Sequence, residues 1–373
     1  MAVNRTSSPE AVLITARGKD HGSERAFFTD PDTGIEYIQL TQAAVHTYAL
    51  YFEIQSFTYD DRSLIVMSMR DSSRGAPWDV YRVDEDGNNL VQLSDDKHPL
   101  NSPAPAHDSR RIFCLRKNSF LSLDIDTFEE VEIARCEEAT ALSNGTLTRD
   151  NKYYLAKATL TKNGDSAVVR FATDGSETEV FFEGVPHGHL DANSSSGKMS
   201  FNSIQDGRRA PMVCNIDGTG LKEFGWWKFA HSCWYGNTSK LQGPLLPPDR
   251  GIVILDTDDE TITPVCSGGP YFWHAGSSWD GEWIISDTNW PDEGLMLVHV
   301  PSGRFAPLCE SGSANGHPQY NHPHPGFNRA GSKVVYTSNR TGLGQAYIAT
   351  IPDHIKEDLS VGDLSNRRRR QRP

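Results

Sequence analysis

The chain has 373 residues, of which 37% are hydrophobic and 23% are charged, so it can bury a large core and lacks the composition of a disordered protein. Its formal net charge of −13 argues against a nucleic-acid partner, because phosphate groups are bound by a basic face. The one basic run, at residues 367–370, is interpreted as a solvated C-terminal tail.

The sequence gives no sign of a membrane or secretory segment. It contains no apolar stretch of about 18 residues, and residues 1–10 lack a basic segment followed by an apolar one. We therefore expect no membrane span and no signal peptide, and a cytoplasmic location. The six cysteines are scattered without a Cys-x-x-Cys pair, which is typical of reduced, mostly buried thiols.

The predicted elements begin with a strand at residues 34–40, followed at residues 41–49 by the one segment compatible with a short helix. Beyond it, short apolar strands recur between turn-forming pairs such as Asp60-Asp61 and Asp280-Gly281, at intervals of roughly 40 to 50 residues. Runs at residues 64–67, 112–115 and 283–285 are typical of second strands in hairpins, and runs at residues 80–84 and 297–300 of third strands. This period is that of propeller blades with four strands each.

The two ends of the repeat array complement each other. The last interval supplies only three strands, whereas the strand at residues 34–40 has no blade of its own. We expect that strand to complete the last blade by pairing with residues 346–349, which removes the unpaired edges of an open array. The prediction is an all-β single domain, a seven-bladed β-propeller spanning residues 26–352, with residues 353–373 as a flexible C-terminal tail.

Histidines occupy one repeated place in successive blades. His189, His231, His274 and His324 each stand shortly before a blade's turn, at the start of the innermost strand. Innermost strands line the axial channel of a propeller, so these side chains should converge on one mouth of it. A single histidine in a β-protein is commonly a structural hydrogen-bonding group, but several that face one narrow channel favour a metal site.

The densest histidine run lies near the end of the array, in the segment that contains His317, His322 and His324. The prolines at positions 323 and 325 fix φ and remove backbone donors, which holds this segment extended. Neutral imidazoles together with a carboxamide oxygen, and without a nearby cysteine, suit Mn²⁺ or a similar octahedral ion better than structural Zn²⁺. Fe²⁺, Co²⁺ and Ni²⁺ are further candidates.

The segment Gln319-Tyr320-Asn321-His322-Pro323-His324-Pro325, with its Gln-x-x-His-x-His spacing, resembles the final blade of oligogalacturonate lyases. Further family landmarks are Asn215-Ile216-Asp217-Gly218, His231-Ser232-Cys233-Trp234 and His274-Ala275-Gly276-Ser277, so that the resemblance extends over nearly the whole chain. The chain departs from the family at Ser232, where an acidic residue is usual, and at residues 236–248. These departures leave the exact sugar open.

The resemblance implies a Mn²⁺-dependent β-elimination from 4-linked uronates, with a small acidic oligosaccharide as substrate. A neutral histidine, with an ordinary pKa of about 6.5, can remove the weakly acidic proton beside the carboxylate, while a metal ion and an arginine stabilise the charge that develops. The implied metal ligands are His274, Gln319, His322 and His324. The implied catalytic residues are His231 as the base, with His189 or His187 as alternatives, and Arg209 or Arg208 as the cation.

Two further residues are candidates for substrate binding. His189 shares the channel position, and Arg70 could hold a second carboxylate at the channel mouth, although a structural ion pair explains Arg70 equally well. Two other classes of function fit the same fold: a non-catalytic propeller that scaffolds partners, and another metal-dependent carbohydrate enzyme such as an epimerase or a lyase for a different acidic sugar.

Overall fold

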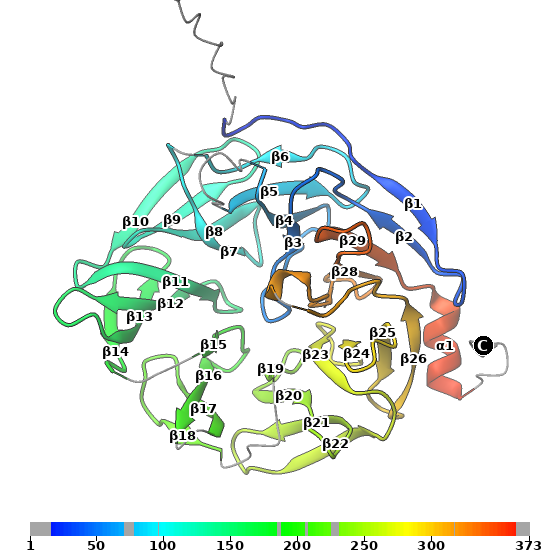
Figure 1. Cartoon of the computed structure of the whole chain (residues 1–373). Helices are drawn as coiled ribbons and strands as arrows, with labels where there is room; N and C mark the ends of the chain where they lie inside the picture. Colours follow the sequence, from blue (N-terminus) through cyan, green and yellow to red (C-terminus); the bar gives the residue numbers. More distant parts are fainter. Residues whose placement is uncertain are drawn as a thin grey trace, which may run out of the picture.

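The computed structural model describes residues 16–70, 78–95, 97–184, 188–205, 208–224, 231–316 and 318–362. Within these residues, seven antiparallel sheets surround a central channel as the blades of a propeller (Figure 1). The predicted all-β fold with seven blades is thus confirmed.

The first three blades follow the chain from their inner to their outer strands. The first contains β3 (Thr47–Ala49), β4 (Ser63–Ser68), β5 (Asp79–Asp84) and β6 (Val91–Gln92). The second contains β7 (Asn101–Pro105), β8 (Arg111–Arg116), β9 (Ser119–Asp124) and β10 (Glu130–Arg135). The third contains β11 (Ala139–Leu147), β12 (Tyr153–Leu160), β13 (Ser166–Ala172) and β14 (Thr178–Phe181).

The next three blades repeat the same order. The fourth contains β15 (Gly188–Asp191), β16 (Lys198–Gln205), β17 (Arg208–Asn215) and β18 (Lys222–Glu223). The fifth contains β19 (Cys233–Trp234), β20 (Lys240–Pro244), β21 (Gly251–Asp256) and β22 (Ile262–Ser267). The sixth contains β23 (Phe272–Ser277), β24 (Trp283–Thr288), β25 (Leu295–His299) and β26 (Arg304–Cys309).

The seventh blade joins the two ends of the chain. Its order is β27 (Gly326–Phe327), β28 (Lys333–Ser338), β29 (Gln345–Thr350), β2 (Glu36–Gln39) and β1 (Ala26–Thr29). Strand β2 is antiparallel to β29, with Tyr37 opposite Ala349 and Gln39 opposite Tyr347. The N-terminal segment therefore contributes two strands to this blade, and β1 makes it the one five-stranded sheet among the described residues.

The hydrophobic core lies between neighbouring blades rather than in the channel. Every residue of β4 is buried, whereas the outer strand β10 is mostly exposed. Leu64 and Val66 of the first blade pack in one cluster with Val335 and Ile348 of the last. Apolar runs of this kind suit strands that are covered on both faces, and this packing leaves the channel to polar side chains.

Two expectations about helix were wrong. Residues 41–49 contain no helix, and β3 occupies their end, where the Thr47 hydroxyl lies 2.7 Å from that of Ser68 on the next strand. The first part of the expected flexible tail is instead helix α1 (Asp353–Val361), which buries Ile355 and Leu359 against the sixth blade. With 9 residues, this helix is too short for the spacing of its apolar residues to predict it from the sequence. Residues 363–373, with the basic run, lie outside the described residues.

Two further expectations concern the cysteines and membrane spans. All six cysteines are free and buried, as expected for reduced thiols. The one α-helix among the described residues is neither long nor apolar enough to cross a membrane.

Gly145, on β11, is required by close packing. A Cβ atom at this position would lie 1.6 Å from the Tyr154 hydroxyl, and Tyr154 is fully buried, stacks on Phe120 and donates a 2.6 Å hydrogen bond to the carbonyl oxygen of Ser102. We expect Gly145→Ala to lower the free energy of unfolding by about 3 kcal/mol, measured by urea denaturation, because the overpacked ring cannot move aside.

A matched substitution separates this clash from the general effect of replacing glycine. Gly316 has an ordinary φ, and the nearest atom to a Cβ there is the carbonyl oxygen of Ala314 at 3.8 Å. Gly316→Ala should leave the urea midpoint unchanged. Equal midpoints for Gly145→Ala and the parent chain would contradict the packing argument.

Candidate metal centre at one mouth of the channel

The inner strands begin with an unusual backbone conformation at the same place in five blades. The residues there have positive φ, between 45° and 52°: Ser102, Asn144, His189, His231 and His324. The strand register of the second, third and fourth blades shifts around these residues, as expected for β-bulges that redirect side chains. In the sixth blade His274 lies within a similar register shift, between Phe272 and Ala275. Of the five residues with positive φ, Asn144, His189 and His324 line a single cavity.

Three of the predicted ligands meet at this mouth. One ring nitrogen from each of His274, His322 and His324 lies within 4.8 Å of the others. His322 follows a short 3₁₀ helix, η2 (Gln319–Asn321), in an extended conformation, and the left-handed residue His324 precedes β27. All three side chains are buried. The histidine run and the channel position therefore form one cluster, which we call the histidine triad.

The orientation of His274 is fixed by a carboxylate on the neighbouring strand. Asp287, on β24, accepts hydrogen bonds from the His274 backbone N–H at 2.6 Å and from Nδ1 at 2.8 Å. The other ring nitrogen, Nε2, is buried and has no hydrogen-bond partner among the described residues. Metal-bound histidines commonly hold their second nitrogen in this way, so the residues present fit a divalent cation.

The protonation state of the histidine triad also suits a metal. Burial lowers the pKa of His274 and that of His324 well below the ordinary value, and the neighbouring imidazoles lower both further. Both rings are therefore neutral at pH 7. Metal ions bind the neutral form of imidazole, so protons would compete only under acidic conditions.

Gln319, the fourth predicted ligand, lies beside the triad but is exposed to solvent. Its Nε2 atom is 3.3 Å from Nε2 of His324. The oxygen and nitrogen of an amide exchange places by a simple flip, so the carboxamide oxygen can face the same region. Its role as a ligand stays a prediction.

The predicted base, His231, adjoins the histidine triad without being part of it. Its ring centroid is 4.7 Å from that of His274 and 4.6 Å from that of Trp273. The Tyr51 hydroxyl lies 3.3 Å from its Nδ1 atom. His189 is the next ring, with centroids 5.3 Å apart, and its Nδ1 atom lies 3.0 Å from the buried carboxylate of Glu53.

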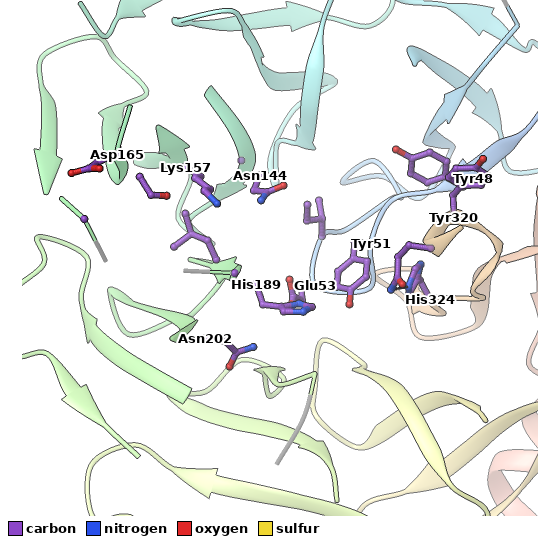
Figure 2. A pocket seen from close by; sticks show the side chains of 17 residues that line it. Tyr48, Tyr51, Glu53, Asn144, Lys157, Asp165, His189, Asn202, Tyr320 and His324 are labelled. Atoms are coloured by element: carbon purple, nitrogen blue, oxygen red, sulfur yellow. Dashed lines mark hydrogen bonds and ion pairs between the residues drawn. The ribbon is translucent and has the colours of Figure 1, made fainter. Parts of the chain in front are cut away.

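A cavity of about 760 Å³ opens beside these histidines. Figure 2 shows His189 and Glu53 near its middle, His324 on one side and Lys157 on the other. Three tyrosines, Tyr48, Tyr51 and Tyr320, supply aromatic surface to its wall. The cavity thus combines aromatic faces, a cation and the edge of the histidine triad.

Not all predicted site residues join this cluster. The guanidinium of Arg70 forms two hydrogen bonds with the Glu24 carboxylate, at 2.8 and 2.6 Å, so the ion-pair alternative replaces its predicted substrate contact. Arg208 and Arg209 begin β17, but their side chains are outside what the structure describes. His187 and His317 also lie outside the described residues.

Four contributing residues were missed from the sequence: Tyr51, Glu53, Lys157 and Asp287. Tyr51 and Glu53 follow the first inner strand, just beyond residues 41–49, where the sequence predicts a short helix. Asp287 is a buried acid within an apolar strand, which is itself a signal of a structural or ligand-orienting role. Lys157 gave no signal, because lysines on second strands are ordinarily solvated.

Asp287→Asn should weaken metal binding while the fold persists. The amide keeps the shape of the carboxylate but offers one accepting oxygen in place of the two that hold His274, and loss of such a partner costs about 10- to 100-fold in metal affinity. Titration with Mn²⁺, followed by the paramagnetic signal of the free ion, measures the change. Unaltered affinity in a folded Asp287→Asn protein would show that the carboxylate does not support a bound ion.

Fold and site together define a seven-bladed β-propeller with a buried histidine triad at one mouth of its channel. No family model matches the sequence. The chain is 21% identical to the oligogalacturonide lyase of Pectobacterium atrosepticum, an alignment that covers 88% of this chain and 96% of that protein.

Two solved structures resemble the whole fold. An oligogalacturonate lyase in complex with manganese has a TM-score of 0.77 at 19% identity, covering 92% of this chain and 100% of the other. The oligogalacturonate lyase of Vibrio parahaemolyticus has a TM-score of 0.76 at 19% identity, covering 91% and 100%. The resemblance to oligogalacturonate lyases that the sequence motifs indicate is therefore confirmed in both sequence and fold.

Proposed function

We propose that the protein is a metal-dependent carbon–oxygen lyase that cleaves short, 4-linked uronate oligosaccharides of the oligogalacturonate type by β-elimination in the cytoplasm. The observation that carries the proposal is the buried histidine triad, with His274 and His324 neutral and a further histidine, His231, beside it and outside it. The similarity to oligogalacturonate lyases supports the same reading.

His274, His322, His324 and Gln319 would hold the cation, which we propose to be Mn²⁺, the metal named for one similar structure. When bound, a divalent cation supplies Lewis-acid stabilisation for the substrate carboxylate. The chain itself supplies the remaining components of the reaction.

The proposed base is His231. It removes the proton from carbon 5 of the uronate, the bond between carbon 4 and the glycosidic oxygen breaks, and a double bond forms between carbons 4 and 5. The departing oxygen takes a proton from water and leaves as a hydroxyl group. The Tyr51 hydroxyl, 3.3 Å from Nδ1, helps to orient the ring. Arg209 or Arg208 is the proposed second cation for the charge that develops on the carboxylate.

Substrate binding is assigned to the cavity. His189, held by Glu53, lines it next to His231, and Lys157 offers a cation to a second uronate carboxylate. Tyrosine faces are suited to the apolar faces of sugar rings. In a chain with a net charge of −13, a local cation is needed to attract an acidic sugar.

The direct test is incubation with a panel of uronate disaccharides and trisaccharides, with Mn²⁺ and with EDTA. The proposal expects a metal-dependent product with the ultraviolet absorbance of a conjugated enol acid, or the open keto-uronate seen by mass spectrometry. An epimerase would change the sugar without cleaving it. A metal-loaded protein that leaves the entire panel unchanged would overturn the uronate proposal.

A further inference from the structure

The channel has a second polar mouth, at the far ends of the inner strands. There, just before the turn into each second strand, stand His107, Arg149, Trp279 and Arg329 from the second, third, sixth and seventh blades. The third and sixth blades face each other across the channel (Figure 1). These four side chains meet there, so the group, which we call the arginine mouth, closes the end opposite the histidine triad.

Two positive charges approach the same aromatic ring in the arginine mouth. The guanidiniums of Arg149 and Arg329 each lie over the indole of Trp279, with the central carbon 4.1 Å from the ring centroid. Burial lowers the pKa of Arg149 to about 10, and the charge of Arg329 adds to this effect. Cation–π contact offsets part of the cost, but the mutual repulsion of two partly buried cations calls for a nearby negative charge.

No carboxylate of the described residues pairs with either guanidinium. Arg149 donates to the Asn193 side-chain oxygen at 3.1 Å and to the carbonyl oxygen of Gly236 at 2.5 Å. The Arg329 side chain makes no hydrogen bond within the described ranges. Its fork of N–H donors is therefore available to a ligand.

The nearest acid does not fill this role. Asp191 is close enough to raise the pKa of Arg149, but its two oxygens accept backbone hydrogen bonds from Asn193 at 2.9 Å and Trp234 at 3.3 Å. Burial raises the pKa of Asp191 to about 7, so its charge is only partly developed at neutral pH.

A small cavity lies between the two arginines. Its volume is about 50 Å³, and its lining includes Arg149, Arg329, Trp279, Asn193 and Asn328, together with the acids Asp191 and Glu53. The Glu53 carboxylate is held by His189, 3.0 Å from its Nδ1 atom. A single water occupies roughly 10 to 15 Å³ on this measure, so the space accommodates a group of several atoms. Close by, against the same indole, His107 has a buried Nε2 atom without a hydrogen-bond partner among the described residues.

We propose that the arginine mouth is a binding site for a small oxyanion, a carboxylate or phosphate group held by Arg149 and Arg329. Two oxygens of a carboxylate or of a phosphate match the guanidinium fork, and a negative charge there relieves the repulsion between the two arginines. The site lies at the other end of the channel from the histidine triad and does not depend on the lyase proposal.

Thermal unfolding of the full chain tests the site. Inorganic phosphate at millimolar concentration should raise Tm by about 1 to 3 °C relative to sodium chloride of equal ionic strength, because the ligand binds only the folded state. A parallel series with acetate distinguishes a phosphate site from a carboxylate site. Calorimetric titration with phosphate should give one site per chain.

Single substitutions test whether the phosphate-induced shift in Tm arises at the arginine mouth. Arg329→Gln should abolish the phosphate-induced shift, and it leaves intact the hydrogen bonds that Arg149 makes to Asn193 and Gly236. Arg135→Gln, at an exposed ion pair with Glu132, is the matched control and should keep the shift. His324→Ala should also keep it, which separates this site from anion binding at the histidine triad.

The outcomes are decisive in both directions. A shift retained in Arg329→Gln, a shift lost in His324→Ala, or equal stabilisation by chloride, acetate and phosphate would overturn the oxyanion site. Loss in Arg329→Gln alone, with Arg135→Gln and His324→Ala unaffected, supports it whether or not the protein cleaves uronates.

Discussion

Replacing His231 by alanine is expected to abolish turnover of any uronate that the parent chain cleaves, while Mn²⁺ binding and substrate affinity persist. The ring adjoins His274 with centroids 4.7 Å apart but lies outside the histidine triad. A base that acts only in the transition state lowers kcat and kcat/KM together, and general-base catalysis contributes about 10²- to 10⁴-fold. Steady-state kinetics and metal analysis on the same preparation measure both properties.

A histidine on the outer surface provides the control for this substitution. His354 is exposed on α1, and His354→Ala should match the parent chain in kcat, KM and metal content. Loss of metal from His231→Ala would make that residue a ligand instead of a base. Parent-like turnover in His231→Ala would transfer the role of base to His189, which shares contacts with the same Tyr51 ring.

The double variant His322→Ala/His324→Ala is expected to lose the metal while it keeps the propeller. Removing two imidazoles from the histidine triad leaves too few donors, so the loss of Mn²⁺ affinity should exceed the roughly 10- to 100-fold typical of losing a supporting residue. Both residues precede β27 and lie outside the strands of the blade, so the blades should persist. Elemental analysis after dialysis and circular dichroism check the two statements.

Thermal denaturation is a second test of metal binding in the same variant. Mn²⁺ should raise the Tm of the parent chain and leave that of the double variant unchanged, since a ligand stabilises only the state that binds it. His299 is the matched control, a buried histidine on β25 away from the triad, and His299→Ala should still retain the metal. Stoichiometric Mn²⁺ in the double variant would refute the assigned ligands.

Local signals explain why much of the fold could be predicted. Pairs such as Asp280-Gly281 form the hairpin turn by themselves, and Gly281 has a φ of 75°, so the spacing of such pairs gives the blade period directly. Strand β1 and helix α1 could not be read in the same way. Strand β1 is largely exposed and pairs with its sequence neighbour β2, so it has no buried apolar run to mark it. Helix α1 is stabilised by packing on a distant blade, where Ile355 and Leu359 join Trp283 and Leu297 in one cluster.

The site, like the fold, could be predicted where it depends on nearby residues and not where it depends on residues distant in sequence. His322 and His324 are close in sequence. His324 precedes its blade turn much as His274 precedes its own, so the sequence alone predicts that these histidines lie together. The partners that hold the side chains in place come from elsewhere: Glu53 reaches His189 from another blade, and Glu24 pairs with Arg70 across the strands between them. Pairings of this kind depend on strand register and loop path, which composition and spacing do not specify.

The left-handed residue in or just before the inner strand of five blades bears on how such proteins change over time. Ser102 and Asn144 share this backbone geometry with His189, His231 and His324. Asparagine, histidine and serine accept it more readily than branched residues do. These five blades can therefore exchange this residue through a single codon without shifting a strand. The rim of the channel can acquire new chemistry blade by blade, while the sheets behind it keep their sequence and their stability.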